Sequence, residues 1–228
     1  MQAAKITIIA GHYGSGKTTL AVNYAIALKE HYDRVAGCNK VALCDMDIVN
    51  PYFRTADHAG LLEQTGVELI SSPFANTNVE MPWAPVEALR VFDDPALTSV
   101  VDLGGDDCGA LAIGRYAGKL RSRDDVALWM VVNPYRPLTR DLDSLLAVRQ
   151  EIEYAGKLRF TGLVYNANIG EETTADLIEA GFPVVRELSA ALDLPIVMTA
   201  VRKDIALDVP ENMGGRFDIV CHENRFGV

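Results

Sequence analysis

Cysteine is scarce in this chain, and its cysteines follow no recognisable pattern. Cys38, Cys44, Cys108 and Cys221 include no C-x-x-C pair and no spacing typical of a Cys/His metal site. Cys221 is followed directly by His222, and two adjacent residues do not have the spacing of zinc ligands. We therefore expect reduced thiols with mostly structural roles and no metal site built from them.

Long hydrophobic runs and clusters of basic residues are lacking as well. The longest apolar stretch, 126–132, is far shorter than the roughly 20 residues of a membrane-spanning helix. The net charge of −10 opposes generic binding to a nucleic-acid backbone, since such binding needs clustered Lys and Arg. A strand-like run begins almost at the N-terminus and leaves no room for a signal peptide. We expect a cytoplasmic protein that binds neither nucleic acid nor membrane.

The composition is that of an ordinary globular protein, with 49% apolar and 23% charged residues. A length of 228 residues suffices for one α/β domain, and we expect a single domain over residues 1–228. Strand-like apolar runs lie at 5–10, 40–45, 67–71, 98–102, 126–132, 160–165 and 195–200. Helical patterns alternate with them at 17–31, 84–92, 108–121, 138–155, 173–191 and 203–208. This alternation predicts an α/β fold with helices on both faces of a mainly parallel twisted sheet.

The loops that follow the strands of such a sheet are where its ligands bind. Loops 11–18, 46–58, 103–109 and 166–172 should converge beyond the carboxyl ends of the strands. Residues 71–85 form the longest irregular segment, with three prolines and Trp83 inside it. We interpret this segment as an ordered loop, which serves as a lid or partner surface or is merely packed over the core.

The first of these loops has a complete phosphate-binding signature. Residues 11–18 read G-H-Y-G-S-G-K-T, which matches G-x-x-x-x-G-K-[ST] between a strand-like run and a helical pattern. Lys17 reaches the β- and γ-phosphates in such a loop, and the Thr18 hydroxyl can bind Mg²⁺. The predicted phosphate-binding residues are Gly11, His12, Tyr13, Gly14, Ser15, Gly16, Lys17, Thr18 and Thr19. The expected fold class is therefore a three-layer αβα P-loop NTPase domain.

Acidic residues end the second and fourth strand-like runs. Asp45 and Asp47 would be costly at the end of a buried strand without a nearby cation, which a Mg²⁺-nucleotide supplies. We expect one of them to support the metal and the other to orient the attacking water, with a solvated loop pair as the alternative. Asp102 has the Walker B position and is expected to hold Mg²⁺ directly or through water.

The segment after Asp102 is suited to sensing a γ-phosphate. Gly104 and Gly105 let backbone N–H groups approach that phosphate, and let the loop move when the phosphate leaves. Asp106 and Asp107 either extend the acidic cluster or cap the helix that follows.

The base-binding residues are harder to predict. The only Asn-Lys pair, at 39–40, lacks the Asp of an N-K-x-D motif and precedes the wrong strand, which favours adenine over guanine. Asn166 follows the sixth strand-like run, and its amide can donate to and accept from an adenine edge. An Asn that merely forms a turn is the alternative.

With these motifs in view, the chain resembles the ParA, MinD and nitrogenase iron protein group of P-loop ATPases. The resemblance lies in segments 16–28, 45–47, 102–105, 162–166 and 201–204. Segments 45–54 and 104–107 further resemble an ATP-binding subgroup of it.

This resemblance implies roles for individual residues. It implies that Lys17 and Thr18 bind phosphate and Mg²⁺. It further implies that Asp47 positions the hydrolytic water and that Asp102 supports the metal. Asn166 and Arg202 fall where the group contacts its base.

The resemblance also raises the question of a homodimer. The group commonly forms a nucleotide-sandwich dimer, in which a second lysine early in the loop reaches the partner's phosphates. His12 has that position here, and a neutral imidazole does not replace a permanent ammonium, although a protonated one partly does. A homodimer stays an open expectation, and segment 216–226 lacks the basic amphipathic pattern of membrane-targeted relatives.

We weigh three functions on this basis. The leading one is an Mg-ATP-binding protein with slow ATP hydrolysis that acts as a nucleotide-dependent switch on a protein partner. The alternative is a P-loop kinase that transfers the γ-phosphate to a small molecule, with Tyr52, Arg54 and Trp83 in its acceptor site. The third is a nucleotide-dependent adaptor or maturation factor in which hydrolysis is vestigial.

Overall fold

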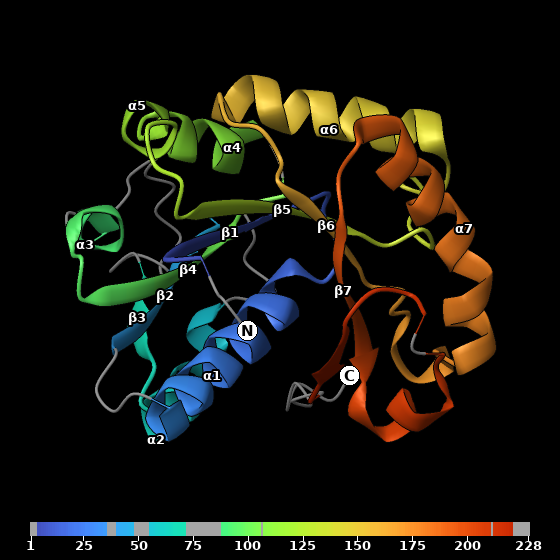
Figure 1. Cartoon of the computed structure of the whole chain (residues 1–228), viewed down its shortest axis with the longest axis horizontal. Helices are drawn as coiled ribbons and strands as arrows, with labels where there is room; N and C mark the ends of the chain where they lie inside the picture. Colours follow the sequence, from blue (N-terminus) through green and yellow to red (C-terminus); the bar gives the residue numbers. More distant parts are fainter. Residues whose placement is uncertain are drawn as a thin grey trace.

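Eight parallel strands form the centre of the molecule (Figure 1). The computed structural model describes residues 4–35, 40–47, 55–71, 88–105, 107–210 and 212–220. The strands are β1 (Ile6–Ala10), β2 (Lys40–Met46), β3 (Glu68–Ile70), β4 (Leu97–Leu103), β5 (Val126–Val132), β6 (Gly162–Tyr165), β7 (Ile196–Arg202) and β8 (Arg216–Ile219). Their order in the sheet is β3-β2-β4-β1-β5-β6-β7-β8, and every pair is parallel.

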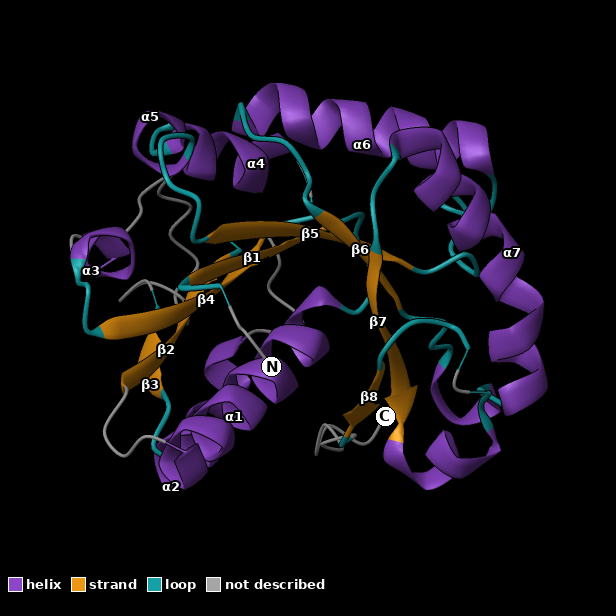
Figure 2. Cartoon of the chain, viewed as in Figure 1, coloured by secondary structure: helices purple, strands orange, loops and turns teal. Residues whose placement is uncertain are grey.

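Helices cover both faces of this sheet (Figure 2). The α-helices are α1 (Lys17–Val35), α2 (Ala59–Thr65), α3 (Ala88–Asp93), α4 (Asp107–Gly114), α5 (Ala117–Leu120), α6 (Leu142–Gly156) and α7 (Ala175–Leu192). Three 3-10 segments are η1 (Thr55–His58), η2 (Gly170–Glu172) and η3 (Lys203–Asp208). In Figure 2, α1 and α2 lie on one side of the sheet, and α4, α5 and α6 lie on the other.

The strands build two separate cores because alternate side chains enter opposite faces of the sheet. In β1, Ile6 and Ile8 belong to the core under α4, α6 and α7, whereas Ile9 belongs to the core under α1. In the second core, Tyr24 of α1 packs edge-on against Trp129 of β5, with ring centroids 5.0 Å apart. Strands that are apolar on both faces are typical of a parallel sheet between two helical layers.

The predicted architecture is confirmed. The three-layer α/β fold with a parallel sheet is present, and the strand predicted at 126–132 has those same bounds. The remaining predicted strands differ from the observed ones by only a few residues at their ends.

Several predicted elements were wrong in detail. The helix predicted at 108–121 is two helices, because α4 ends at Gly114 and α5 begins at Ala117. A Cβ on Gly114 would lie 2.7 Å from the carbonyl oxygen of Ala155, so α4 and α6 are in close backbone contact where the first helix ends. The helix predicted at 203–208 is a 3-10 segment, and α2 and β8 were not predicted. Of the helix predicted at 84–92 the structure describes the part from Ala88 onward, in α3.

Some predicted regions lie outside the described residues. They are most of the 71–85 segment and residues 48–54 of the 46–58 loop. Within the part of the chain that the structure describes, no helix is long and apolar enough to cross a membrane.

Candidate nucleotide-binding site

The loop between β1 and α1 has the backbone conformation that its glycines allow. Gly14 and Gly16 have φ values of +73° and +89°, a region that favours glycine. Gly11 has φ +150°, and a Cβ there would lie 2.6 Å from the carbonyl oxygen of Val131 in β5. The loop is closed by the Ser15 N–H, which donates to the His12 carbonyl over 3.1 Å. Gly11 therefore lets the loop approach β5, while Gly14 and Gly16 provide its positive φ angles.

The helix that follows presents its N-terminus to this loop. Helix α1 begins at Lys17, and its first turn contains no acidic side chain. Free backbone N–H groups and the helix dipole make such an N-terminus favourable for an anion. Lys17 is only 6% exposed, and its Nζ donates to the His12 carbonyl over 3.3 Å. The loop, the helix end and the ammonium group thus have the arrangement expected of a phosphate site.

Two aspartates face this site from adjacent strands. Asp45 in β2 and Asp102 in β4 are register partners, and both are buried. Asp45 lies two residues after Leu43, and Asp102 lies two residues after Val100, so the members of each pair lie on the same face of the sheet. Since Leu43 and Val100 belong to the core under α1, both aspartates lie on the α1 side of the sheet. Asp45 Oδ1 accepts a hydrogen bond from the Asp47 N–H over 3.0 Å, which fixes the turn at the end of β2. The structure therefore brings Asp45, Asp47 and Asp102 to the carboxyl edge beside the phosphate loop.

The surroundings of Asp102 disfavour its charged form. Burial raises the pKa of its carboxyl group to about 6, against the opposing effects of the Lys17 ammonium and the hydroxyl groups of Thr18 and Thr55. The negative charge of Asp47 raises this pKa further. One oxygen, Oδ2, accepts a hydrogen bond from Thr55 Oγ1 over 3.2 Å. The other, Oδ1, is buried with no hydrogen-bond partner among the described residues.

These residues fit a magnesium ion held together with a nucleotide. A buried carboxylate oxygen without a partner costs free energy unless a cation or donor is present. Mg²⁺ on a nucleotide needs only one or two protein ligands, because phosphates and water supply the rest. Within the described ranges no group of three or more His, Cys, Asp or Glu side chains is placed to hold a metal alone. The carboxylate of Asp102 and the hydroxyl of Thr18 are the groups that would hold Mg²⁺ here.

Gly105 brings the segment after β4 into direct contact with the phosphate loop. A Cβ at Gly105 would lie 2.7 Å from Lys17 Nζ and 2.8 Å from the backbone nitrogen of Tyr13. Only a glycine allows so close an approach. A change in the conformation of the phosphate loop would therefore displace the segment after β4 as well.

The predicted base-contacting residues lie at the same edge of the sheet. Asn166 follows β6 and is buried, and its Nδ2 donates to the Ser15 carbonyl over 2.7 Å. This hydrogen bond of Asn166 fixes the phosphate loop at Ser15. Its predicted contact with an adenine edge stays a prediction.

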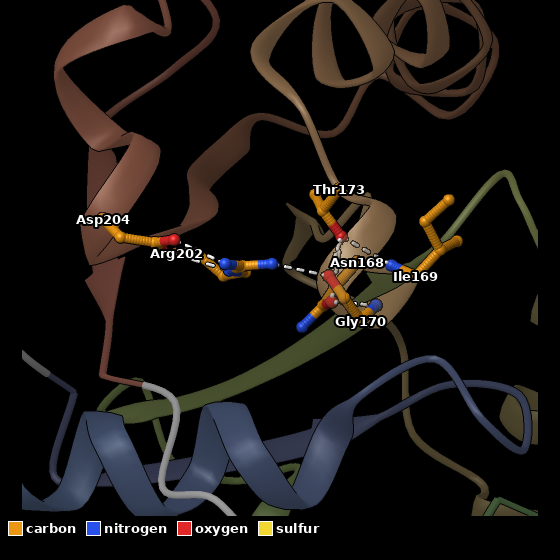
Figure 3. A network of polar contacts seen from close by, with 6 residues as sticks. All are labelled: Asn168, Ile169, Gly170, Thr173, Arg202 and Asp204. Carbon is orange, nitrogen blue, oxygen red and sulfur yellow. Dashed lines mark hydrogen bonds and ion pairs between the residues drawn. The ribbon is translucent and has the colours of Figure 1, made fainter.

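Arg202 ends β7 and ties two loops together (Figure 3). Its Nη1 donates to the Gly170 carbonyl over 2.7 Å, and its guanidinium forms an ion pair with Asp204. Around Gly170, Asn168 Oδ1 accepts from the Gly170 N–H over 2.8 Å and from Thr173 Oγ1 over 3.2 Å. This network orders the loop after β6 and places Arg202 beside it.

Two polar residues near the phosphate loop were missed by sequence reasoning. Thr55 in η1 donates to Asp102, and Arg136 in the loop after β5 donates to the Gly14 carbonyl over 2.8 Å. The loop after β5 was overlooked because sequence order alone does not show that β5 is the neighbour of β1. Its signal was Asn133-Pro134, a turn directly after the longest apolar run.

Other residues of the sequence hypotheses lie outside what the structure describes. Residues Tyr52, Arg54, Trp83, Asp106, Cys38, Cys221 and His222 are not among the described residues. Asp107 is the first residue of α4.

Comparisons with known proteins find similar folds among solved structures. No protein-family model matches the sequence, and no curated protein is significantly similar to it. Among solved structures, the cell division protein FtsY from Thermotoga maritima is similar over 86% of this chain, with a TM-score of 0.59 and 15% identity. Chloroplast FtsY from Physcomitrella patens is similar over 87%, with a TM-score of 0.56 and 18% identity. The signal recognition particle 54 kDa protein from Aeropyrum pernix, solved in complex with GDP, is similar over 84%, with a TM-score of 0.52 and 19% identity.

The similarity covers only part of these proteins. The chain spans 61%, 58% and 40% of their respective lengths. At such identities the likeness concerns the fold, and it does not confirm the resemblance to the ParA and MinD group. What the chain shares with these proteins is an α/β domain with a parallel sheet of the P-loop NTPase type.

Proposed function

We propose that this protein binds Mg-ATP, hydrolyses it slowly, and acts as a nucleotide-dependent switch on a protein partner. The observation that carries this proposal is the contact of Gly105 with both Lys17 and the Tyr13 backbone. A γ-phosphate bound by the loop would meet this segment directly, so that its arrival and loss would move the start of α4. Coupling between a phosphate and a mobile segment is the basis of switching in P-loop proteins.

The chemistry follows from residues at the carboxyl edge of the sheet. Lys17 balances the charge of the β- and γ-phosphates, while Thr18 and Asp102 would hold the metal ion. When bound, Mg²⁺ offsets the charge that develops on the transferred phosphoryl group. Asp47 orients the attacking water, whose oxygen forms a bond to the γ-phosphorus as the bond to the bridging oxygen breaks. ADP and inorganic phosphate are the products.

The choice of ATP over GTP rests on the loop after β6. This loop reads N-A-N-I from Asn166 and lacks the carboxylate that an N-K-x-D motif offers to guanine. Bound GDP in the 54 kDa protein of the signal recognition particle supports the opposite choice. The two nucleotides are therefore compared directly in the test.

The test is equilibrium binding of fluorescently labelled ATP and GTP, with Mg²⁺ or with EDTA. We expect ATP to bind more tightly than GTP, and Lys17→Ala to abolish binding. Lys119→Ala is the matched control, since Lys119 is exposed and pairs with Asp93 on α3, away from the phosphate loop. Tighter binding of GTP would overturn the choice of base, and binding that is insensitive to Lys17→Ala would overturn the site itself.

A measurement of phosphate release separates the switch from the kinase alternative. A switch ATPase releases phosphate slowly without any acceptor. Turnover that appears only when a small-molecule acceptor is added would favour the kinase.

A further inference from the structure

We propose that Arg136 is a second phosphate-binding cation of the nucleotide site, acting within the same chain beside Lys17. This inference rests on the proposed function, and it assigns to the loop after β5 a role that the phosphate-binding signature does not contain. Arg136 also gives the site a permanent positive charge in addition to that of Lys17. His12 has the position at which the group that the chain resembles carries its second lysine.

The side chain of Arg136 lies against the phosphate loop at Gly14. Its Nε donates to the Gly14 carbonyl over 2.8 Å. A Cβ at Gly14 would lie 3.5 Å from Nε, 3.7 Å from Cδ and 3.8 Å from Cζ of Arg136. The end of the side chain is therefore in van der Waals range of Gly14, and the two Nη groups extend from that point.

The backbone of Arg136 is held rigidly in place. Its N–H donates to the Asn133 carbonyl over 3.2 Å, and its own carbonyl accepts from the Thr139 N–H over 3.0 Å. Thr139 is fully buried, and its Oγ1 donates to the Asn133 carbonyl over 2.6 Å. Asn133 Nδ2 in turn donates to the Asn168 carbonyl over 2.8 Å, which joins this turn to the loop after β6. A guanidinium on such a turn is positioned before a ligand binds, which reduces the entropy that binding costs.

Within the part of the chain that the structure describes, the charge of Arg136 has no counterion. Among the described residues no carboxylate lies within ion-pair distance of it, and neither Nη group has an acceptor. Arg202 differs in this respect, because its guanidinium is paired with Asp204. A guanidinium without a described counterion is unexpected beside the phosphate loop of a chain with a net charge of −10, unless the loop receives an anion. Guanidinium groups bind phosphate oxygens with two donors at once, so a nucleotide phosphate is the matching ligand.

The experiment compares Arg136→Ala, Arg136→Lys and Arg136→Gln in displacement of fluorescently labelled ADP. The competitors are unlabelled ATP, ADP and adenosine in the presence of Mg²⁺. Arg140→Ala is the matched control, because Arg140 lies in the same loop, its side chain is 74% exposed, and it forms an ion pair with its neighbour Asp141. Lys17→Ala tests the site as a whole.

We expect Arg136→Ala to weaken the binding of ATP and ADP about 10- to 100-fold, which is the effect of losing a charged hydrogen bond. The affinity for adenosine should change less than about twofold. Arg136→Lys should retain part of the affinity for ATP and ADP, and Arg140→Ala should match the wild type. Equal losses for adenosine and ATP would overturn the phosphate contact in favour of the base or ribose. Full affinity in Arg136→Gln would overturn it in favour of a role in shaping the loop through Gly14. Full affinity in Arg136→Ala with loss in Lys17→Ala would overturn the inference and leave the proposed function intact, whereas absence of wild-type binding would remove both.

Discussion

Replacing Asp102 by Asn measures what the protein loses in stability by keeping a carboxylate beside its phosphate loop. Burial raises the pKa of this group from its usual 3.8 to about 6. The folded protein therefore binds this proton more tightly than the unfolded chain does. The destabilisation is complete above pH 6, falls as the pH drops through 6, and disappears below about pH 3.8. Each pKa unit corresponds to about 1.4 kcal/mol, so the carboxylate lowers the free energy of unfolding by about 3 kcal/mol at neutral pH.

The asparagine variant cannot ionise and so lacks this destabilisation. The pKa of about 6 already includes the attraction of Lys17, but an amide does not reproduce every contact of a protonated carboxyl group, and the net stabilisation at pH 7.5 should be about 1–3 kcal/mol. For a chain of this size that is a rise in Tm of roughly 2–10 °C. The advantage over wild type should shrink when the pH is lowered to 5.

The assay is urea unfolding at pH 7.5 and pH 5.0, with EDTA and without nucleotide. Asp93→Asn is the control, since Asp93 is an exposed carboxylate in a surface pair with Lys119, and it should change stability by less than about 0.5 kcal/mol. A variant that is less stable than wild type by the same amount at both pH values would show that the buried charge of Asp102 does not lower the free energy of unfolding. That result would mean that Asp102 is a structural residue rather than one held for a ligand.

Three further perturbations test the site. Gly105→Ala should weaken nucleotide binding at least about tenfold, because its Cβ would lie within 2.8 Å of the Tyr13 nitrogen, whereas Gly118→Ala, with open space around it, should be neutral in the same titration. Asn166→Ala should lower the free energy of unfolding by about 1–3 kcal/mol, because the buried carbonyl of Ser15 loses its donor; an unchanged urea midpoint would contradict this. His12→Lys should raise the ATP-dependent dimer fraction above that of wild type in light scattering on an Asp47→Ala background, and equal masses in both proteins would exclude a role for this position in dimerisation.

The fold was largely predictable from the sequence because its signals are local. Apolar β-branched runs that alternate with helical patterns indicate a parallel α/β sheet, and the run at 126–132 is long enough to give both ends of β5. Short or amphipathic elements were missed. Strand β8 is an edge strand with partly exposed residues, and α2 is a short helix after a 3-10 turn, so neither has a strong periodic pattern.

The phosphate loop was predictable for the same reason, since all its residues are consecutive. Arg136 was not, because its contact with Gly14 joins residues 122 positions apart in the sequence. Finding it requires knowing that β5 adjoins β1, and this order is a property of the folded sheet. Asn166 was selected from the sequence for the edge of a base, while in the structure its amide nitrogen holds Ser15.

A switch of this kind requires the segment after β4 to respond to the γ-phosphate. Hydrogen–deuterium exchange of residues 103–114 tests it most directly, with no nucleotide, with ADP, and with a non-hydrolysable ATP analogue, each with Mg²⁺. We expect amide protection of this segment to rise with the ATP analogue and to fall back with ADP. Exchange that is the same in the two nucleotide states, with both nucleotides shown to be bound, would contradict it.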